Sequence, residues 1–210
     1  MALIDMVAAE RVAVADLIDS LDAEQLATQS LCANWTVREV AAHFTAPFEI
    51  KTLAFVKGVL THGFSFDKAN ADFAKRIAAA STPADISRVI RENAYNPWTP
   101  PGSGLEAPLA DAVLHGQDIR RPLGLTRDFE SETMKVVLSL LTSGKAKTLT
   151  SKKLVAGLAF DAPDAGWRGG EGALVRGPAE AMAMVLSGRN VSIEPLSGPG
   201  VALLRTRLSG

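Results

Sequence analysis

Hydrophobic residues recur every three or four positions over most of the first 145 residues, which is the period of an amphipathic helix. One such stripe covers residues 3–20. Another covers residues 108–124, with Pro108 at its start and Pro122 and Gly124 at its end, which are the positions where these residues favour helix boundaries. The pattern predicts four main helices with additional turns, arranged as a bundle.

Two helix starts carry capping sequences. Thr36 is followed three positions later by Glu39, the arrangement of a capping box. Thr82 is followed by proline and then, at the third helical position, by aspartate. We expect the helix that begins after Thr36 to run to about Leu60, with a bend at Pro47, because proline cannot donate the backbone hydrogen bond to the carbonyl of His43.

The pattern changes after residue 145, where short apolar runs alternate with glycine-rich turns. We expect strands within residues 153–163 and 173–175, a short helix within 177–189, and final strands within 190–196 and 201–208. The predicted fold is therefore mostly α, with a helical bundle at residues 1–147 and a small α+β domain at residues 148–210.

Composition narrows the class of protein. The 210 residues are 47% hydrophobic and carry a formal net charge of −1, so no bulk charge favours nucleic acid or an anionic membrane. No apolar run approaches the ~18 residues of a membrane span, and the first residues lack the basic region of a secretory signal. Cys32 is the single cysteine, which excludes an internal disulfide. We interpret Cys32 as a small buried hydrophobe and predict a cytoplasmic protein.

Three polar residues interrupt the apolar stripe of segment 108–124. With Asp111 set at 0° on a helical wheel, His115 falls at ~40° and Asp118 at ~−20°, with apolar neighbours on either side. Buried carboxylates need cations, hydrogen-bond donors or a metal ion. Asp111 and His115 are four residues apart, so both can reach one ion.

A third ligand is available on another predicted helix. His43 shares its helix face with Val40 and so points toward the core, whereas His62 precedes a glycine and has the character of a surface or capping residue. One hypothesis is therefore a mononuclear site formed by His43, Asp111 and His115. In the alternative, His43 is a hydrogen-bonded core histidine, and Asp111 and His115 pair with each other.

The donor set also suggests which metal would bind. Two imidazoles and one carboxylate suit Zn²⁺ best, and Ni²⁺ or Fe²⁺ are further candidates. Asp118 would accept a hydrogen bond from a ligand imidazole. In the alternative, Asp118 forms an ion pair with Arg120 or Arg121.

Three segments together resemble one known family. "LCANWTVREVAAHF", "DAVLHGQDIRRPLG" and "GEGALVRGPAEAMAMVLSGR" resemble, in this order, segments of the mycothiol-dependent maleylpyruvate isomerases and their uncharacterised actinobacterial relatives. These proteins belong to the DinB-like superfamily of metal-binding four-helix bundles. The resemblance implies a DinB-like bundle with a small C-terminal α+β unit.

The resemblance also implies a site and a chemistry. It places the metal ligands at His43, Asp111 and His115, where the family isomerase has two histidines and a glutamate; Asp111 is one methylene shorter and reaches ~1.5 Å less far. The metal would activate the thiol of mycothiol. That thiol would add to a small electrophile, allow rotation about the former double bond, and leave in an isomerase or stay attached in a transferase.

Other functions fit the same pattern. A non-catalytic metal-binding or regulatory bundle needs no open coordination position, and a metal hydrolase would need a general base, for which Asp118 is the candidate. The partners expected are a small-molecule substrate and a low-molecular-weight thiol, in a monomer or homodimer. We expect the pocket where the two histidine-bearing helices meet the loop at residues 96–104, with Trp98 at its mouth and Arg168 or Arg176 as candidate contacts for a polar cofactor.

Overall fold

The computed structural model describes residues 1–146 and 149–209, which fold into two compact units. The first unit comprises residues 1–99 and 111–126, and the second comprises residues 100–110 and 127–210. The helices and strands are, in chain order, α1 (Leu3–Ser20), α2 (Ala23–Ala27), α3 (Val37–His43), α4 (Ala46–Glu49), α5 (Thr52–Thr61), α6 (Phe66–Ala80), α7 (Pro83–Glu92), α8 (Glu106–Arg120), the 3₁₀ helix η1 (Arg121–Leu123), α9 (Ser131–Thr142), α10 (Lys152–Val155), β1 (Leu158–Ala162), β2 (Trp167–Gly170), β3 (Ala173–Arg176), α11 (Ala179–Leu186), the 3₁₀ helix η2 (Asn190–Ser192) and α12 (Val201–Leu208).

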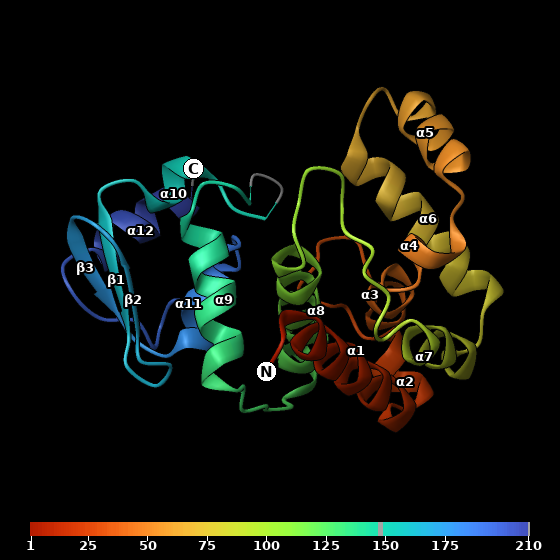
Figure 1. The fold of residues 1–210 in the computed structure, drawn as a ribbon, viewed down its shortest axis with the longest axis horizontal. Coiled ribbons are helices and arrows are strands. Elements are labelled where there is room, and N and C mark those ends of the chain that lie inside the picture. Colours follow the sequence, from red (N-terminus) through yellow and green to blue (C-terminus); the bar gives the residue numbers. More distant parts are fainter. Residues whose placement is uncertain (147–148, 210) are drawn as a thin grey trace. The chain divides into compact units, whose positions relative to one another are not determined.

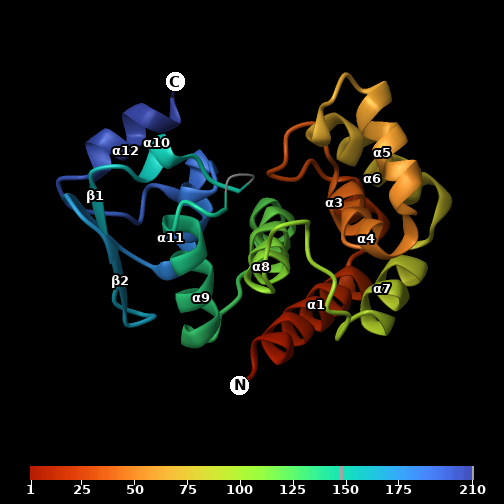
Figure 2. The same ribbon diagram turned by 45° about the horizontal axis from the view of Figure 1, so that its top comes forward.

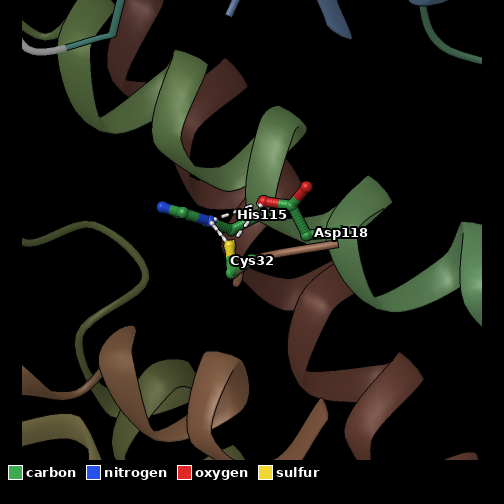
Figure 3. A group of neighbouring side chains, drawn as sticks. All are labelled: Cys32, His115 and Asp118. Atoms are coloured by element: carbon green, nitrogen blue, oxygen red, sulfur yellow. Dashed lines mark hydrogen bonds and ion pairs between the residues drawn. The ribbon is translucent and has the colours of Figure 1, made fainter. Parts of the chain in front are cut away.

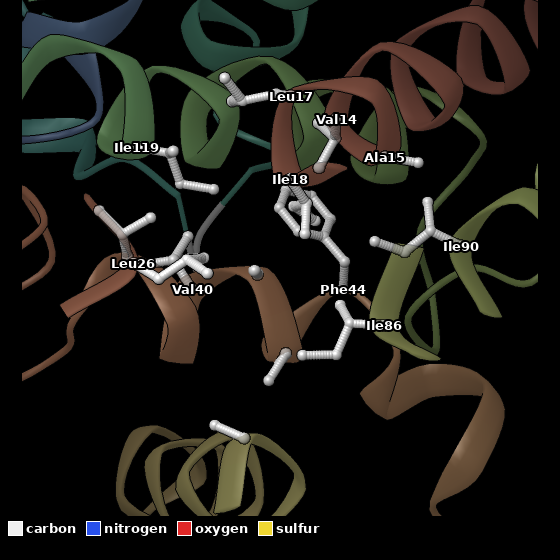
Figure 4. Packing of buried hydrophobic residues seen from close by; sticks show 14 of the residues in the cluster. Val14, Ala15, Leu17, Ile18, Leu26, Val40, Phe44, Ile86, Ile90 and Ile119 are labelled. Atoms are coloured by element: carbon white, nitrogen blue, oxygen red, sulfur yellow. The ribbon is translucent and has the colours of Figure 1, made fainter. Parts of the chain in front are cut away.

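The first unit is built from helices that share one apolar core. Helix α1 packs against α7, and α3 packs against α6 (Figure 1). The core contains side chains from α1, α3, α7 and α8, among them Val14, Val40, Ile86 and Ile119, each at most 1% exposed (Figure 4). Burial of such side chains contributes about 1.5–3 kcal/mol each, so this core is what holds the helices in place.

The predicted helix starts in this unit are confirmed. At α3, the Glu39 side chain accepts a hydrogen bond from the backbone N–H of Thr36 (2.7 Å), and the Thr36 hydroxyl accepts one from Glu39 N–H (3.3 Å). At α7, Thr82 and Asp85 form the same reciprocal pair, with Pro83 as the first helical residue. These capping bonds satisfy backbone donors that have no partner inside the helix.

The prediction of one helix from residue 37 to about Leu60 is wrong. The structure has three shorter helices here, α3, α4 and α5, and α3 ends at His43. Pro47 explains the first break, because it has no N–H to donate to the carbonyl of His43 and instead sits in the first turn of α4. His43 is therefore the last residue of its helix rather than a residue in its middle.

The second unit holds a small sheet covered by helices. Its strand order is β2-β1-β3; β1 pairs antiparallel with β2 and parallel with β3. Helix α9 packs against α11 and β2 (Figure 2), and the indole N–H of Trp167 on β2 donates to the Ser139 hydroxyl on α9 (2.9 Å). Phe160 on the central strand is 2% exposed and lies in the core of this unit.

Expectations for the C-terminal part are confirmed only in part. Strand β3 and helix α11 are found where expected, whereas β2 at Trp167–Gly170 is not among the expected strands. Of the strand expected within residues 153–163, only the second half is confirmed as β1, since Lys152–Val155 forms helix α10. The final strands predicted at 190–196 and 201–208 are wrong: the first segment contains a 3₁₀ turn and the second is α12. Val201, Leu204 and Leu208 recur at helical rather than alternating spacing, and Leu204 is the fully buried residue of α12. The predicted domain boundary between residues 147 and 148 lies outside the described residues.

The predicted fold class is confirmed. The described residues are mostly helical, and the three strands are confined to the C-terminal part of the chain. None of the helices in residues 1–146 and 149–209 combines the length and the apolar character that a membrane span needs.

Candidate metal centre

Helices α3 and α8 bring the predicted ligands together. His43 ends α3, while Asp111 and His115 lie one turn apart on α8, so their side chains project from the same face of that helix. All three belong to the first unit. Their side chains are partly accessible: His43 and His115 are 15% exposed and Asp111 is 34% exposed.

The separations within this cluster suit metal ligands better than hydrogen-bond partners. Asp111 Oδ1 lies 3.7 Å from His43 Nε2 and 3.5 Å from His115 Nε2. Both separations are long for a hydrogen bond between nitrogen and oxygen. Two ligands that each lie about 2.0–2.2 Å from one tetrahedral Zn²⁺ are roughly 3.3–3.6 Å apart. The donor atoms of the three residues all lie within 4.8 Å of one another.

His43 does not have the contacts of a hydrogen-bonded core histidine. Its Nδ1 atom is buried and has no hydrogen-bond partner in the described part of the chain. Its Nε2 atom faces Asp111. Nδ1 is thus an exception to the rule that buried polar groups are paired, and Nε2 is the ring nitrogen that faces the cluster.

The electrostatics of the cluster favour an ionised Asp111. Burial acts to raise the pKa of Asp111, but His115, His43 and Arg11 outweigh it, so the pKa lies below its ordinary value. Burial likewise acts to lower the pKa of His115, and it is outweighed by Asp111, Asp118 and Cys32, which hold the pKa of His115 well above its ordinary value. A metal ion at His115 Nε2 would therefore displace a proton.

The second ring nitrogen of His115 faces a different set of groups. Nδ1 lies 2.9 Å from Asp118 Oδ2, and Cys32 Sγ lies 3.0 Å from the same oxygen and 3.5 Å from Nδ1 (Figure 3). Asp118 thus occupies the place expected of an acceptor for a ligand imidazole. The expectation that Cys32 is only a small hydrophobe is wrong, because its thiol takes part in this hydrogen-bonded group.

Aromatic rings line the cluster. The ring centroid of Trp35 lies 5.2 Å from that of His43 and 6.3 Å from that of His115, and Phe44 lies 6.2 Å from His115. Sequence reasoning did not select either ring. Trp35 precedes helix α3 and Phe44 follows its last residue. Helical periodicity therefore does not predict the direction of their side chains.

Other residues named from the sequence have different surroundings. Trp98, in the first unit, is 41% exposed, and its backbone amide donates to the Asn96 side chain (3.0 Å). Arg168 and Arg176 both pair with Asp161 within the second unit, at 3.2 and 2.6 Å. His62 directly follows α5, and its Nδ1 lies 2.7 Å from the carbonyl oxygen of Gly58. The roles suggested for Trp98 and the two arginines stay predictions.

Comparison with known proteins gives one family match and two structural likenesses. The family described as "Mycothiol maleylpyruvate isomerase N-terminal domain" matches residues 7–95. Two solved structures, titled as the mycothiol-dependent maleylpyruvate isomerase and a histidine-to-alanine mutant of it, are each 14% identical in sequence and cover 95% of both chains, with TM-scores of 0.42 and 0.43. No curated protein sequence matches the chain. The family match thus covers residues 7–95, and this part of the chain resembles the mycothiol maleylpyruvate isomerase N-terminal domain.

Proposed function

We propose that this chain is a metal-dependent enzyme that uses mycothiol as a thiol cosubstrate, either to isomerise a small electrophile or to attach the whole thiol to it through its sulfur. The observation that carries the proposal is the convergence of His43, Asp111 and His115, whose donor atoms face one another at separations typical of metal ligands. The family of the N-terminal domain supports mycothiol as the thiol.

The donor set fits a divalent ion. His43 Nε2, one oxygen of Asp111 and His115 Nε2 would hold it, and two imidazoles with one carboxylate suit Zn²⁺ ahead of Ni²⁺ or Fe²⁺. When bound, such an ion supplies a Lewis acid that lowers the pKa of a coordinated thiol, so that the reactive thiolate is present at neutral pH. The shorter side chain of Asp111 does not prevent this arrangement, since its Oδ1 lies within 3.7 Å of both imidazoles.

The residues around the ligands favour an open, reactive site over a closed structural one. Three protein ligands leave a coordination position for a small molecule, whereas structural zinc sites have four protein ligands. The partial exposure of Asp111 gives solvent access to that position. Trp35 and Phe44 flank the two imidazoles and limit the water around them, and Asp118 holds His115 with Nε2 toward the cluster.

The arrangement of Asp118 disfavours the alternative of a metal hydrolase. A general base must reach the water that it deprotonates. Asp118 is fully buried, and its Oδ2 contacts the Nδ1 side of His115, opposite the nitrogen that faces Asp111. Asp118 therefore supports a ligand instead of contacting a substrate.

The proposal predicts turnover that requires both the metal and the thiol. Zinc-loaded protein should isomerise a small cis-alkene diacid, with maleylpyruvate as the first compound to test, at a rate that saturates with mycothiol concentration. Product formation is followed by chromatography. The thiol is replaced by S-methyl mycothiol in one control, and zinc is removed by a chelator in another. Equal rates with and without the free thiol would contradict the thiol mechanism, and equal rates after zinc removal would contradict the metal dependence.

A further inference from the structure

His115 contacts two separate groups through its two ring nitrogens. Nε2 faces Asp111, while Nδ1 faces Asp118 and Cys32 (Figure 3). The second group also contains nitrogen, oxygen and sulfur donors that could hold an ion. A neutral imidazole has one lone pair and one N–H, so only one of the two sides can bind a metal while the other donates a hydrogen bond.

Accessibility decides which side binds the ion. The Asp118 side chain is 0% exposed, whereas Asp111 is 34% exposed. An ion that exchanges small ligands needs a path to solvent, which the Asp111 side offers. The Nδ1 side of His115 therefore carries the N–H and donates it to Asp118 Oδ2, which fixes the ring tautomer.

The backbone around Cys32 places its thiol firmly against Asp118. The Cys32 amide donates to the Ser30 hydroxyl (3.1 Å), and the Cys32 carbonyl accepts from the amide of Trp35 (3.1 Å). The amide of Leu31 donates to the backbone carbonyl of Asp118 (3.1 Å), so the segment before α3 is tied to α8 next to the thiol. The position of Sγ is thus set by several bonds that do not involve the metal ligands.

We infer that Cys32 is a positioning residue of the metal centre, an inference that rests on the proposed function. Its S–H donates to Asp118 Oδ2, the same oxygen that accepts the N–H of His115. Two donors on one carboxylate oxygen hold Asp118 in the orientation that directs Nε2 of His115 toward Asp111. Cys32 acts through Asp118 and His115 and does not itself contact the ion.

This role predicts that zinc affinity depends on the hydrogen bond that residue 32 donates to Asp118 and not on the sulfur atom itself. Removing a group that supports a metal ligand typically lowers metal affinity 10–100-fold. We expect Cys32→Ala to weaken zinc binding about 10-fold, at the low end of that range. The effect is small because Asp118 Oδ2 still accepts the hydrogen bond from His115 Nδ1 in this variant. Cys32→Ser keeps a donor at the same place and should recover most of the affinity.

The experiment compares full-length wild type, Cys32→Ala and Cys32→Ser. Zinc affinity is measured by competition with a chromophoric chelator, and the Co²⁺-substituted proteins are compared by absorption spectroscopy. Thermal unfolding of the metal-free proteins shows that each variant is folded. We expect visible Co²⁺ bands of similar shape in wild type and Cys32→Ser, shifted bands in Cys32→Ala, and no sulfur-to-cobalt charge-transfer band in any of the three.

Three results would overturn the inference. Equal zinc affinity of wild type and Cys32→Ala would show that the thiol only fills space. A sulfur-to-cobalt charge-transfer band in wild type that disappears in Cys32→Ser would show that Cys32 is itself a ligand. If wild type binds no zinc, the proposed metal centre fails and the inference fails with it, a result distinct from the first two.

Discussion

His115→Ala is expected to lower zinc affinity by more than about 100-fold, beyond the effect typical of losing a residue that only supports a ligand. His115 contributes one of the three proposed donor atoms, Nε2, which lies 3.5 Å from Asp111 Oδ1. The variant leaves His43 and Asp111, on two different helices, as the remaining pair. Zinc affinity is measured by chelator competition at fixed pH, because an ion bound at Nε2 would displace a proton from His115 in the wild type.

His62→Ala is the matched control for this experiment. His62 is one of the three histidines of the chain and lies at the end of α5, against the carbonyl of Gly58. Its removal should leave zinc affinity unchanged. If both alanine variants bind zinc as tightly as wild type, the ion does not bind at the cluster on α3 and α8. Thermal unfolding of the metal-free His115→Ala protein separates loss of the ligand from loss of the fold.

Arg11→Met is expected to destabilise the protein by about 3 kcal/mol. Arg11 is 6% exposed, and its guanidinium donates to the carbonyls of Asn93 (3.0 Å), Ala94 (3.0 Å) and Asn96 (2.7 Å). Methionine keeps most of the apolar stem but leaves three carbonyls without this donor. For a chain of this size, the change corresponds to a fall in melting temperature of roughly 6–12 °C, measurable by circular dichroism.

Arg76→Met provides the comparison for Arg11→Met. Its side chain is 72% exposed, and it pairs with Asp72 at 3.8 Å. Exposed ion pairs of this kind contribute about 0–1 kcal/mol, so the melting temperature should change by only a few degrees. Equal effects of the two substitutions would contradict the structural role assigned to Arg11, because both remove one positive charge.

Local signals in the sequence predicted the elements that carry the site. The capping box of Thr36 and Glu39 is a contact between residues three apart, so its sequence signature fixes the start of α3. The spacing of Asp111 and His115 fixes their common face in the same way. Pro47 predicts a bend, but it does not predict the end of α4 at Glu49 or the start of α5 at Thr52. No side chain caps the start of α5, so this boundary has no capping signature in the sequence.

The residues that surround the cluster were harder to predict. Cys32 and Trp35 precede α3, where no helical period relates side-chain direction to position, so the thiol contact with Asp118 appears only when α3 and α8 are brought together. Arg11 contacts carbonyls more than 80 residues away in the chain. The predictions of strands within residues 190–196 and 201–208 are wrong for another reason. A short apolar run fits both a strand and a helix, so the sequence alone does not separate the two.

The most direct test of the central claim is the zinc X-ray absorption spectrum of the zinc-loaded protein. A centre formed by His43, Asp111 and His115 predicts nitrogen and oxygen ligands at about 2.0–2.2 Å, with the scattering pattern of two imidazoles. Because the chain has three histidines, two imidazoles that persist in the spectrum of His62→Ala would identify His43 and His115. A sulfur ligand at about 2.3 Å, or a spectrum without imidazole scattering, would contradict a metal centre formed by His43, Asp111 and His115.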